Sequence, residues 1–557
     1  MTLQDMRLWN SLLPGIYKQR LEKLAMALVG SLLKKGIIFS NIVANRKKAS
    51  LHLQQKKTLA KLLAKARYTE FGEKYNFDEL LSSILFGEKG AFYEEYKKSV
   101  PVYDYNKIFN EWWHRSLEGE KDICWPGQIK YYALSSGTSE AATKHIPVTR
   151  AMSRAIQKTS IRQILSLGHY KSLPDDLYEK GFLMLGGSTN LSNQDKHFEG
   201  DLSGITAKQI PYWFRPYYKP GEKIASQKDW GLKLEEITKQ AHEWDIGFIV
   251  GVPAWIQLLM EKIIAHYKVK TIHDIWPNLQ VFAHGGVSFE PYRKGFEKLL
   301  ARPLIYINTY LASEGFIAYQ TRPGALGMAL VCDNGIFFEF VPFNEKNFDS
   351  EGTLQPNPET LMVDQVEEGK EYALLMSTCA GAWRYLIGDT IKFVDKEKGE
   401  IVITGRTKHY LSLCGEHLSV DNMNKAIDLV SDEMGLTVKE FTVCGVPYES
   451  LFAHHWYIGV EESDVNTELL KTKIDARLAE LNDDYAVERK HALKEVFVTV
   501  LPNKAFYGWM ESKGKMGGQH KFPRVFKNFL MQDWTDYLSK NGYINDLANP
   551  LNQSTIL

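Results

Sequence analysis

The stretch LQVFAHGGVSFEPYRKGFEKLLARPLIYINTY, residues 279–310, decides the fold class of this chain. Its first part, 279–286, is a short apolar run that ends in two glycines, and its last part, 303–310, is a second apolar run. Residues 290–300 between them predict a helix. A strand, a helix and another strand in succession are typical of a partly parallel sheet with helices packed on it. The stretch therefore predicts an α/β domain.

The same alternation extends upstream. GFLMLGG (181–187) and DIGFIVGVP (245–253) predict two more buried strands, and residues 232–243 predict the helix before the second strand. Pro253 is expected to open a further helix, because proline is favoured in the first helical turn. Thr149 is expected to cap the helix that follows it, because a threonine side chain can accept a hydrogen bond from the first turn.

The pattern changes after residue 315. Residues 315–404 contain short β runs separated by turn residues, which predict an antiparallel sheet or a small barrel appended to the α/β part. From residue 406 onward, helical and β patterns form a compact α+β unit. We therefore expect a large N-terminal domain, residues 1–405, and a smaller C-terminal domain, residues 406–557.

Composition excludes several classes of function. With 68 Lys and Arg against 67 Asp and Glu, the 557-residue chain has no basic excess for neutralising a nucleic-acid backbone. Its five scattered cysteines contain no C-x-x-C pair, which argues against a disulfide framework or a zinc ribbon and favours the reducing cytoplasm. The start, MTLQDMRLWN, does not resemble a secretory signal, and the apolar run 24–33 is shorter than the roughly 20 residues of a membrane span. We expect a cytoplasmic protein with no membrane span and no nucleic-acid partner.

A hydroxyl-rich loop follows the apolar run 131–134. It consists of Ser135, Ser136, Gly137, Thr138 and Ser139. Successive backbone N–H groups in such a loop can form a concave seat for a phosphate. A plain turn is the alternative, because Ser, Thr and Gly are common in turns of every kind. The phosphate interpretation therefore depends on other residues that could hold the rest of a nucleotide.

Four downstream segments have the chemistry to do so, and the last of them, KGKMGGQHKFPR (513–524), has the glycines and basic residues of a mobile loop bearing a charge. Gly285 and Gly286 end a predicted strand, where the missing side chains let a ligand approach the backbone, although a simple strand-to-helix turn also explains them. Tyr310 can stack on a purine, and Glu314 can hold Mg²⁺ through a hard carboxylate oxygen, unless it lies at the surface of a capped turn. Asp389 follows a glycine just before a strand and can accept the hydroxyls of a ribose, with an ordinary turn aspartate as the alternative.

The order of these motifs resembles a known family. SSGTS (135–139), YLASEG (310–315), WRYLIGD (383–389) and GQHKFPR (518–524) follow one another as in the acyl acid–amido synthetases of the Gretchen Hagen family. That family includes plant enzymes that conjugate auxin or jasmonate to amino acids, and it belongs to the adenylate-forming superfamily. The resemblance covers nearly the whole chain. It implies an α/β fold whose large N-terminal adenylation domain has β-sheets flanked by helices and a β-barrel-like subdomain, followed by a small mobile α+β C-terminal domain.

The resemblance also implies a role for each candidate residue. Ser135, Ser136, Gly137, Thr138 and Ser139 would hold the phosphates of ATP. Gly285 and Gly286 would line the adenine, Tyr310 would stack on it with Ser313 nearby, and Glu314 would bind Mg²⁺. Asp389 would bind the ribose, and Arg406 would lie at the hinge between the domains and could also reach the ribose. Lys521, on the mobile domain, would contact the α-phosphate region during adenylation.

We expect from this resemblance an ATP-dependent ligase. It would adenylate a small carboxylic acid with release of pyrophosphate, and then transfer the acyl group to the amine of an amino acid with release of AMP. An acyl-CoA ligase, whose second nucleophile is a thiol, is one alternative, and a non-catalytic acyl- or nucleotide-binding protein is another. We expect a monomer or a weak dimer. The sequence does not identify the acid, the amine or the lining of the acyl pocket.

Overall fold

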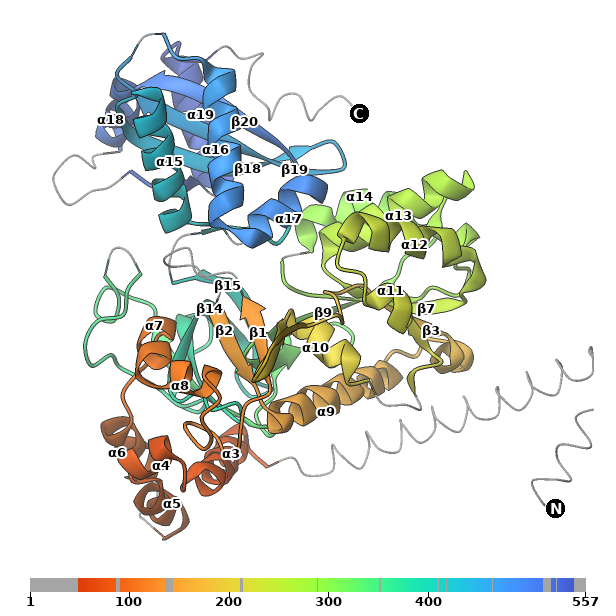
Figure 1. The fold of residues 1–557 in the computed structure, drawn as a ribbon, viewed down its shortest axis with the longest axis vertical. Helices are drawn as coiled ribbons and strands as arrows, with labels where there is room; N and C mark the ends of the chain where they lie inside the picture. The colour runs from red at the N-terminus through yellow and green to blue at the C-terminus, as the bar shows by residue number, and fades with distance from the viewer. Residues whose placement is uncertain are drawn as a thin grey trace, which may run out of the picture.

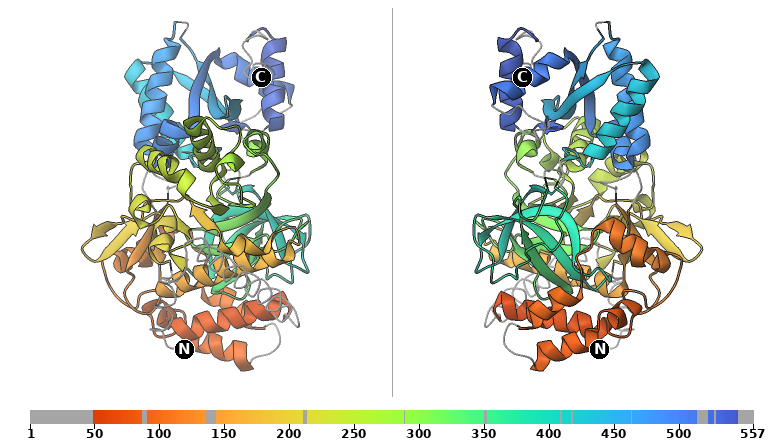
Figure 2. Two further views of the ribbon diagram at one scale, coloured as in Figure 1. Left: turned by 90° about the vertical axis from the view of Figure 1, so that its right-hand side faces the viewer. Right: turned by 90° about the vertical axis from the view of Figure 1, so that its left-hand side faces the viewer.

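The computed structural model describes eleven stretches of the chain. They are residues 49–86, 91–135, 144–210, 214–287, 289–349, 352–407, 410–416, 418–462, 464–513, 522–526 and 528–544. Figure 1 shows a large part, coloured red to green, that contains a long sheet, and a smaller part, coloured blue, that lies against one end of it. The two views in Figure 2 show the same stacking along the vertical axis.

A long sheet organises the large part. Within the described residues, eleven strands follow the order β12-β13-β14-β15-β11-β10-β9-β8-β7-β3-β6. The parallel half contains β3 (Gly181–Met184), β6 (Tyr218–Lys219), β7 (Ile246–Gly251), β8 (Val281–His284) and β9 (Ile305–Ala312). The antiparallel half contains β10 (Gly315–Tyr319), β11 (Met328–Leu330), β12 (Ile336–Pro342), β13 (Glu371–Thr378), β14 (Tyr385–Asp395) and β15 (Glu400–Arg406).

Strand β9 joins the two halves. It pairs in parallel with β8 along one edge and antiparallel with β10 along the other. The strand–helix–strand prediction for residues 279–310 is confirmed, because η7 (Glu290–Tyr292) and α14 (Arg293–Lys298) separate β8 from β9. The predicted antiparallel strands of residues 315–404 continue the same sheet.

Capping and proline chemistry place the helices of the large part where the sequence predicts them. Thr149 Oγ1 accepts a hydrogen bond from Met152 N at 3.0 Å at the start of α9 (Arg150–Ser166). Pro253 is the first residue of α13 (Pro253–Tyr267). Other helices here are α10 (Leu202–Lys208), α11 (Glu222–Ala225) and α12 (Trp230–Gln240). A smaller sheet contains β1 (Tyr131–Ser135), β2 (Lys144–Val148), β4 (Ser192–Gln194) and β5 (His197–Gly200).

Helices near the start of the described chain pack on the antiparallel half. They are α3 (Leu51–Ala66), α4 (Glu70–Lys74), α5 (Phe77–Phe86), α6 (Ala91–Ser99), α7 (Tyr105–Ile108), η1 (Phe109–Trp113) and α8 (His114–Leu117). Of these, α3, α4, α5 and α6 lie at the end of the molecule farthest from the blue part (Figure 1). The buried Gln55 of α3 donates to the carbonyl oxygen of Cys332 at 2.8 Å and accepts from the backbone N–H of Phe338 at 2.6 Å. These contacts satisfy polar groups that would otherwise be costly to bury.

The smaller part is an α+β unit, as predicted. Its four-stranded sheet follows the order β20 (Leu493–Pro502), β19 (Leu451–Val460), β18 (Val438–Tyr448) and β21 (Val525–Phe526). Its helices are α15 (Val420–Met434), α16 (Thr467–Leu481), α17 (Asp483–His491), α18 (Asn503–Ser512) and α19 (Asn528–Lys540). A short hairpin, β16 (Tyr410–Leu411) and β17 (Leu418–Ser419), leads into it.

The large and the smaller part contact each other through a hydrogen bond and a pair of aromatic rings. Trp255 Nε1 on α13 donates to Glu488 Oε1 on α17 at 2.8 Å, and the rings of Tyr292 and Phe452 pack edge to face with centroids 5.0 Å apart. All five cysteines are buried and free. In the ranges described above, no helix combines the length and apolarity needed to cross a bilayer.

Candidate active site

The strands on either side of the hydroxyl-rich loop pair with each other in the structure. Strands β1 and β2 are antiparallel, and Ser135 at the end of β1 pairs with Lys144 at the start of β2. Four of the predicted phosphate-binding residues, Ser136, Gly137, Thr138 and Ser139, lie outside the described residues. The sequence prediction did not include Lys144. The sequence does hold a clue to Lys144, because it is the first residue of the strand that follows the loop.

The glycine pair after β8 has a packing role. A Cβ on Gly285 would lie 2.4 Å from the carbonyl oxygen of Thr309 on β9, so no larger residue fits without moving a strand. Gly286 has φ +84°, a left-handed conformation that glycine adopts without strain. Both glycines therefore allow a tight turn beside β9, and their proposed place against an adenine stays a prediction.

Tyr310, Asp389 and Arg406 are brought together from three strands. The hydroxyl of Tyr310 on β9 donates to Asp389 Oδ2 on β14. Arg406 Nε, at the end of β15, lies 2.8 Å from Asp389 Oδ1, and the two residues are paired across β14 and β15. Burial, followed by the charge of Asp389, raises the pKa of Tyr310 well above its ordinary range, so its hydroxyl remains a donor.

Glu314 lies beside this trio in the turn between β9 and β10, next to the half-buried Ser313. Burial raises the pKa of the Glu314 carboxyl above its ordinary value, and the positive charge of Lys144 offsets part of the rise. Burial raises the pKa of Tyr385 well above its ordinary range too, and the Glu314 charge beside it adds to this shift. A cation bound to this buried carboxyl group would favour its ionised form, so Glu314 is a candidate cation ligand.

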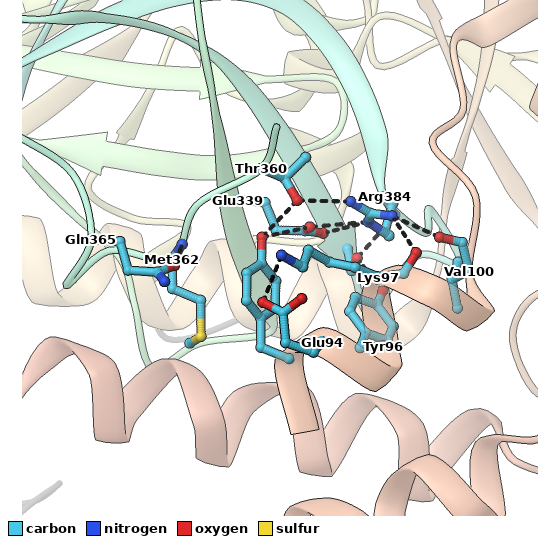
Figure 3. A network of polar contacts seen from close by, with 11 residues as sticks. Glu94, Tyr96, Lys97, Val100, Glu339, Thr360, Met362, Gln365 and Arg384 are labelled. Carbon is cyan, nitrogen blue, oxygen red and sulfur yellow. Dashed lines mark hydrogen bonds and ion pairs between the residues drawn. The ribbon is translucent and has the colours of Figure 1, made fainter. Parts of the chain in front are cut away.

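Arg384 belongs to the same motif as Asp389 but was not predicted to have a role. Its guanidinium is buried against Glu339, with Nε 3.0 Å from Glu339 Oε1 (Figure 3). The signal in the sequence was a charged residue inside an otherwise apolar stretch, WRYLI, because a buried charge needs a specific partner. A groove of about 1080 Å³ runs beside the site, and its lining includes Lys144, Arg384, Gly388 and Arg406.

Glu416 is a second residue that sequence reasoning did not single out as functional. It is fully buried and accepts hydrogen bonds from the backbone N–H groups of Leu413, Cys414 and Gly415. Its Oε1 also lies 2.9 Å from His454 Nε2. Although burial alone would raise it, these contacts hold the pKa of Glu416 below its ordinary value. The contacts attach the segment that follows β15 to strand β19.

Lys521, the predicted α-phosphate contact, lies outside the described residues.

Comparison with known proteins gives three domain matches along the chain. Residues 45–231 match the GH3 family N-terminal domain, residues 329–406 the GH3 family central domain, and residues 421–529 the GH3 family C-terminal domain. Together the three matches cover the chain from residue 45 to residue 529, with gaps at 232–328 and 407–420.

Named relatives agree with these matches. The chain is 27% identical over 185 residues to an indole-3-acetic acid-amido synthetase, GH3.2, of Arabidopsis thaliana, an alignment that covers 31% of this chain and 33% of that protein. It is 29% identical over 181 residues to a jasmonoyl–L-amino acid synthetase, JAR4, of Nicotiana attenuata, covering 31% of this chain and 30% of that protein. The matches thus span about a third of the length of these two relatives.

Two solved structures share the fold. The GH3.15 acyl acid amido synthetase superposes with a TM-score of 0.51 at 17% identity, covering 88% of this chain and 93% of that one. A 2-hydroxyisobutyryl-CoA ligase in complex with 2-HIB-AMP and CoA superposes with a TM-score of 0.53 at 12% identity, covering 86% and 91%. At these identities the likeness concerns the fold.

Proposed function

The chain belongs to the GH3 family, and we propose on this premise that it is an ATP-dependent acyl acid–amido synthetase. The observation that carries the proposal is the meeting of Tyr310, Asp389 and Arg406 beside the buried Glu314. Tyr310, Asp389 and Arg406 come from three separate strands, and together with Glu314 they offer a ribose acceptor, a cation and a carboxylate to one bound nucleotide.

The proposed reaction has two steps. A carboxylate oxygen of the acid attacks the α-phosphorus of ATP, and the bond to the pyrophosphate oxygen breaks. The product is an acyl-adenylate, a mixed anhydride. The amine nitrogen of an amino acid then attacks its carbonyl carbon, the bond to the AMP oxygen breaks, and the amine loses a proton to water. Both steps depend chiefly on stabilising charge at phosphate and carbonyl oxygens.

Asp389 has the capacity that ribose binding requires. Each oxygen of an ionised carboxylate can accept about two hydrogen bonds. Tyr310 contacts one oxygen of Asp389 and Arg406 the other, so each oxygen can still accept a bond from a ribose hydroxyl. We propose that Gly285, Gly286 and the ring of Tyr310 border the adenine, with Ser313 nearby, and that the loop from Ser135 to Ser139 holds the phosphates.

Glu314 fits a magnesium ligand. Mg²⁺ prefers hard oxygen ligands and often takes one or two carboxylates from the protein, with substrate phosphates completing its shell. The raised pKa of Glu314 shows that burial disfavours its charge, and a cation would favour the charged form. When bound, Mg²⁺ would neutralise the phosphate charge that opposes the approach of a carboxylate.

We further propose that the domains divide at residues 405–406 and that the C-terminal domain turns about this point between the two steps. Lys521 would contact the α-phosphate region in the first step and leave it for the second. The partners are a small carboxylic acid and an amino acid. We propose that the enzyme acts in the cytoplasm as a monomer or a weak dimer.

ATP–pyrophosphate exchange over a panel of aromatic and aliphatic acids tests the proposal. We expect acid-dependent exchange that requires Mg²⁺, followed by amide formation when amino acids are supplied. Asp389→Asn should raise the KM for ATP about tenfold or more, because a hydrogen bond to a charged group is worth about 1.5–3 kcal/mol. Asp395→Asn is the matched control, because Asp395 lies on the same strand but pairs with Lys398 near the surface.

Three outcomes would contradict the proposal. Folded protein that supports no exchange with any acid would exclude adenylation. Product formation with coenzyme A but with no amine would make the protein an acyl-CoA ligase. Equal effects of the Asp389 and Asp395 substitutions would exclude the proposed ribose contact.

A further inference from the structure

Arg384 is a buried cation that the proposed chemistry does not use. Its side chain is 5% exposed and its partner Glu339 on β12 is fully buried. Nε donates to Glu339 Oε1 at 3.0 Å and to Oε2 at 3.2 Å, and one terminal nitrogen donates to Thr360 Oγ1 at 3.0 Å. Burying two charges is costly, so an arrangement of this kind is retained only where its geometry is well satisfied.

The guanidinium also holds the last turn of α6 and the segment that follows it. Its second terminal nitrogen donates to the carbonyl oxygens of Val100 at 2.8 Å and Lys97 at 3.1 Å (Figure 3). The backbone of Arg384 contributes to the same attachment, because its carbonyl oxygen accepts from the N–H of Tyr103 at 3.0 Å. Leu386 N in turn donates to the carbonyl oxygen of Tyr103 at 2.8 Å. Residues 384–386 are thus fixed through both side chain and main chain.

The regular pairing of strand β14 with β13 is interrupted directly after residues 384–386. Leu386 pairs with Leu375 on β13, and the next pair is Thr390 with Ala373. Three residues, 387–389, therefore face the single residue Leu374 between those pairs. Bulges of this kind redirect side chains and are frequent at active sites. Here the bulged segment ends with Asp389, the residue that contacts Tyr310 and Arg406.

We propose that Arg384 is a positioning residue of the nucleotide site, whose buried clamp fixes the start of β14 so that the bulge presents Asp389 to the ribose. Arg384 acts through Tyr385 and residues 387–389, and it contacts no substrate itself. The register of a strand stays fixed only where its packing specifies it, and an irregular segment such as 387–389 needs such a fixed point beside it. Arg384 supplies this fixed point, because its contacts reach β12, the segment after α6 and residue 360 at once.

The inference rests on the proposed function, because it requires a ribose at Asp389. The test compares kcat/KM for ATP and for 2′-deoxy-ATP in pyrophosphate exchange. Loss of the 2′-hydroxyl removes a hydrogen bond to Asp389, so the wild-type protein should prefer ATP by about ten- to a hundredfold. A protein that is merely less stable loses active molecules and slows both substrates equally. The ratio of the two values therefore reports on the position of Asp389 alone.

Arg384→Lys keeps the charge but cannot reproduce the planar fork that reaches Glu339, Thr360 and two carbonyl oxygens together. We expect it to reduce the preference for ATP at least fivefold. Thr360→Val removes one contact of the clamp with little change of volume, and it should reduce the preference by a smaller factor. If Arg384→Lys does not fold, the ratio for Thr360→Val decides the test.

Arg489→Lys is the matched control. Arg489 on α17 also contacts a carboxylate, with Nε 2.9 Å from Asp475 Oδ2, and it donates to the carbonyl oxygens of Leu493 and Lys494 at 3.1 Å. It lies in the C-terminal part, so the same change there should leave the ratio unaltered. An equal loss of preference in this control would overturn the inference.

The remaining outcomes separate the inference from the proposed function. A wild-type protein that prefers ATP, together with variants that keep the full preference, overturns the role of Arg384 and leaves the function intact. A wild-type protein that exchanges but does not distinguish the two nucleotides overturns the ribose contact and the inference with it. Absence of exchange with ATP overturns the proposed function.

Discussion

The hydroxyl of Tyr310 donates a hydrogen bond to Asp389 although 79 positions separate the two residues in the chain. Strand β9 carries the first and β14 the second, and the two strands are not neighbours in the sheet. The contact therefore crosses the antiparallel half of the sheet and fixes a buried carboxylate next to Arg406.

Tyr310→Phe removes this donor and keeps the ring. We expect kcat/KM for ATP to fall about tenfold, because a hydrogen bond to a charged acceptor is worth about 1.5–3 kcal/mol. Tyr306→Phe on the same strand is the control, because the Tyr306 hydroxyl has no hydrogen-bond partner among the described residues. Tyr310→Leu, which also removes the ring, should cost more than Tyr310→Phe if the ring stacks on adenine. Equal losses would exclude stacking.

Gly285→Ala should destabilise the protein by about 1–3 kcal/mol, the usual cost of forcing an extra methyl group into a packed site. The added Cβ would lie 2.4 Å from the carbonyl oxygen of Thr309, and moving that oxygen means moving β9. At Gly295 the nearest atom, 3.1 Å away, is the end of the Gln257 side chain, so Gly295→Ala should be tolerated. Thermal unfolding of both variants measures the difference, and similar melting temperatures would contradict the prediction.

Glu488 should make the contact between the two parts sensitive to pH. Burial raises the pKa of Glu488 well above its ordinary value of 4.5, the bond from Trp255 opposes this rise, and the charges of Glu416 and Asp484 add to it. Because the folded form holds the proton more tightly, the stabilisation is complete below about pH 4.5. It is lost as the pH rises through the raised pKa.

Glu488→Gln keeps the acceptor for Trp255 and removes the titration. We expect its melting temperature to fall less than that of the wild type as the pH rises above 4.5, the ordinary value of the group. Glu468→Gln, at an exposed position of α16, should follow the wild-type curve. Parallel curves for wild type and Glu488→Gln would show that Glu488 does not titrate in this range.

The pair Arg384 and Glu339 should show strong coupling in stability. Replacing either residue alone, as Arg384→Met or Glu339→Leu, leaves a buried charge without its counter-charge and should cost about 3–5 kcal/mol. The double variant should cost less than the sum of the two single changes, because it removes both charges. Denaturant unfolding of all four proteins measures the coupling, and simple additivity would contradict it.

Lys521→Ala should slow pyrophosphate exchange much more than it weakens the binding of ATP, because the resemblance assigns Lys521 to the α-phosphate during adenylation. Exchange rates and nucleotide binding, measured on the same preparation, separate the two effects. Lys513→Ala is the control, because Lys513, the residue directly after α18, is paired with Asp533. Comparable losses of rate and affinity would refute the assigned role.

Much of the fold could be predicted because its signals are local. Each signal lies within one helix or strand and depends only on residues close to it in the chain. Such signals include apolar runs of four to eight residues, glycine pairs and caps such as Thr149. Strands β3, β7, β8 and β9 and helices α12, α13 and α14 therefore appear where the sequence indicates, whereas α10 and α11 were not predicted. The order of the strands in the sheet could not be predicted from the sequence, because it depends on which strands pair once the chain has folded.

The candidate site divides in the same way. Ser135, Gly285, Tyr310, Glu314 and Asp389 could be named from residue type and from the order of the motifs. Their mutual contacts could not, because each contact joins segments far apart in the chain. Lys144 and Arg384 were missed for this reason, since a lysine or an arginine gains a role only from the buried groups that surround it.

The sequence by itself determined the order of the elements, the family and the candidate site residues. The reason is that hydrophobic periodicity, turn residues and the order of the motifs are properties of the sequence alone. Only the tertiary structure decided that β9 joins a parallel to an antiparallel half, that Tyr310 and Arg406 hold Asp389 between them, and that Arg384 is paired with Glu339. The physical reason is that a buried charge or hydroxyl must find a partner in three dimensions, and the cost of leaving it unpaired acts across the whole fold.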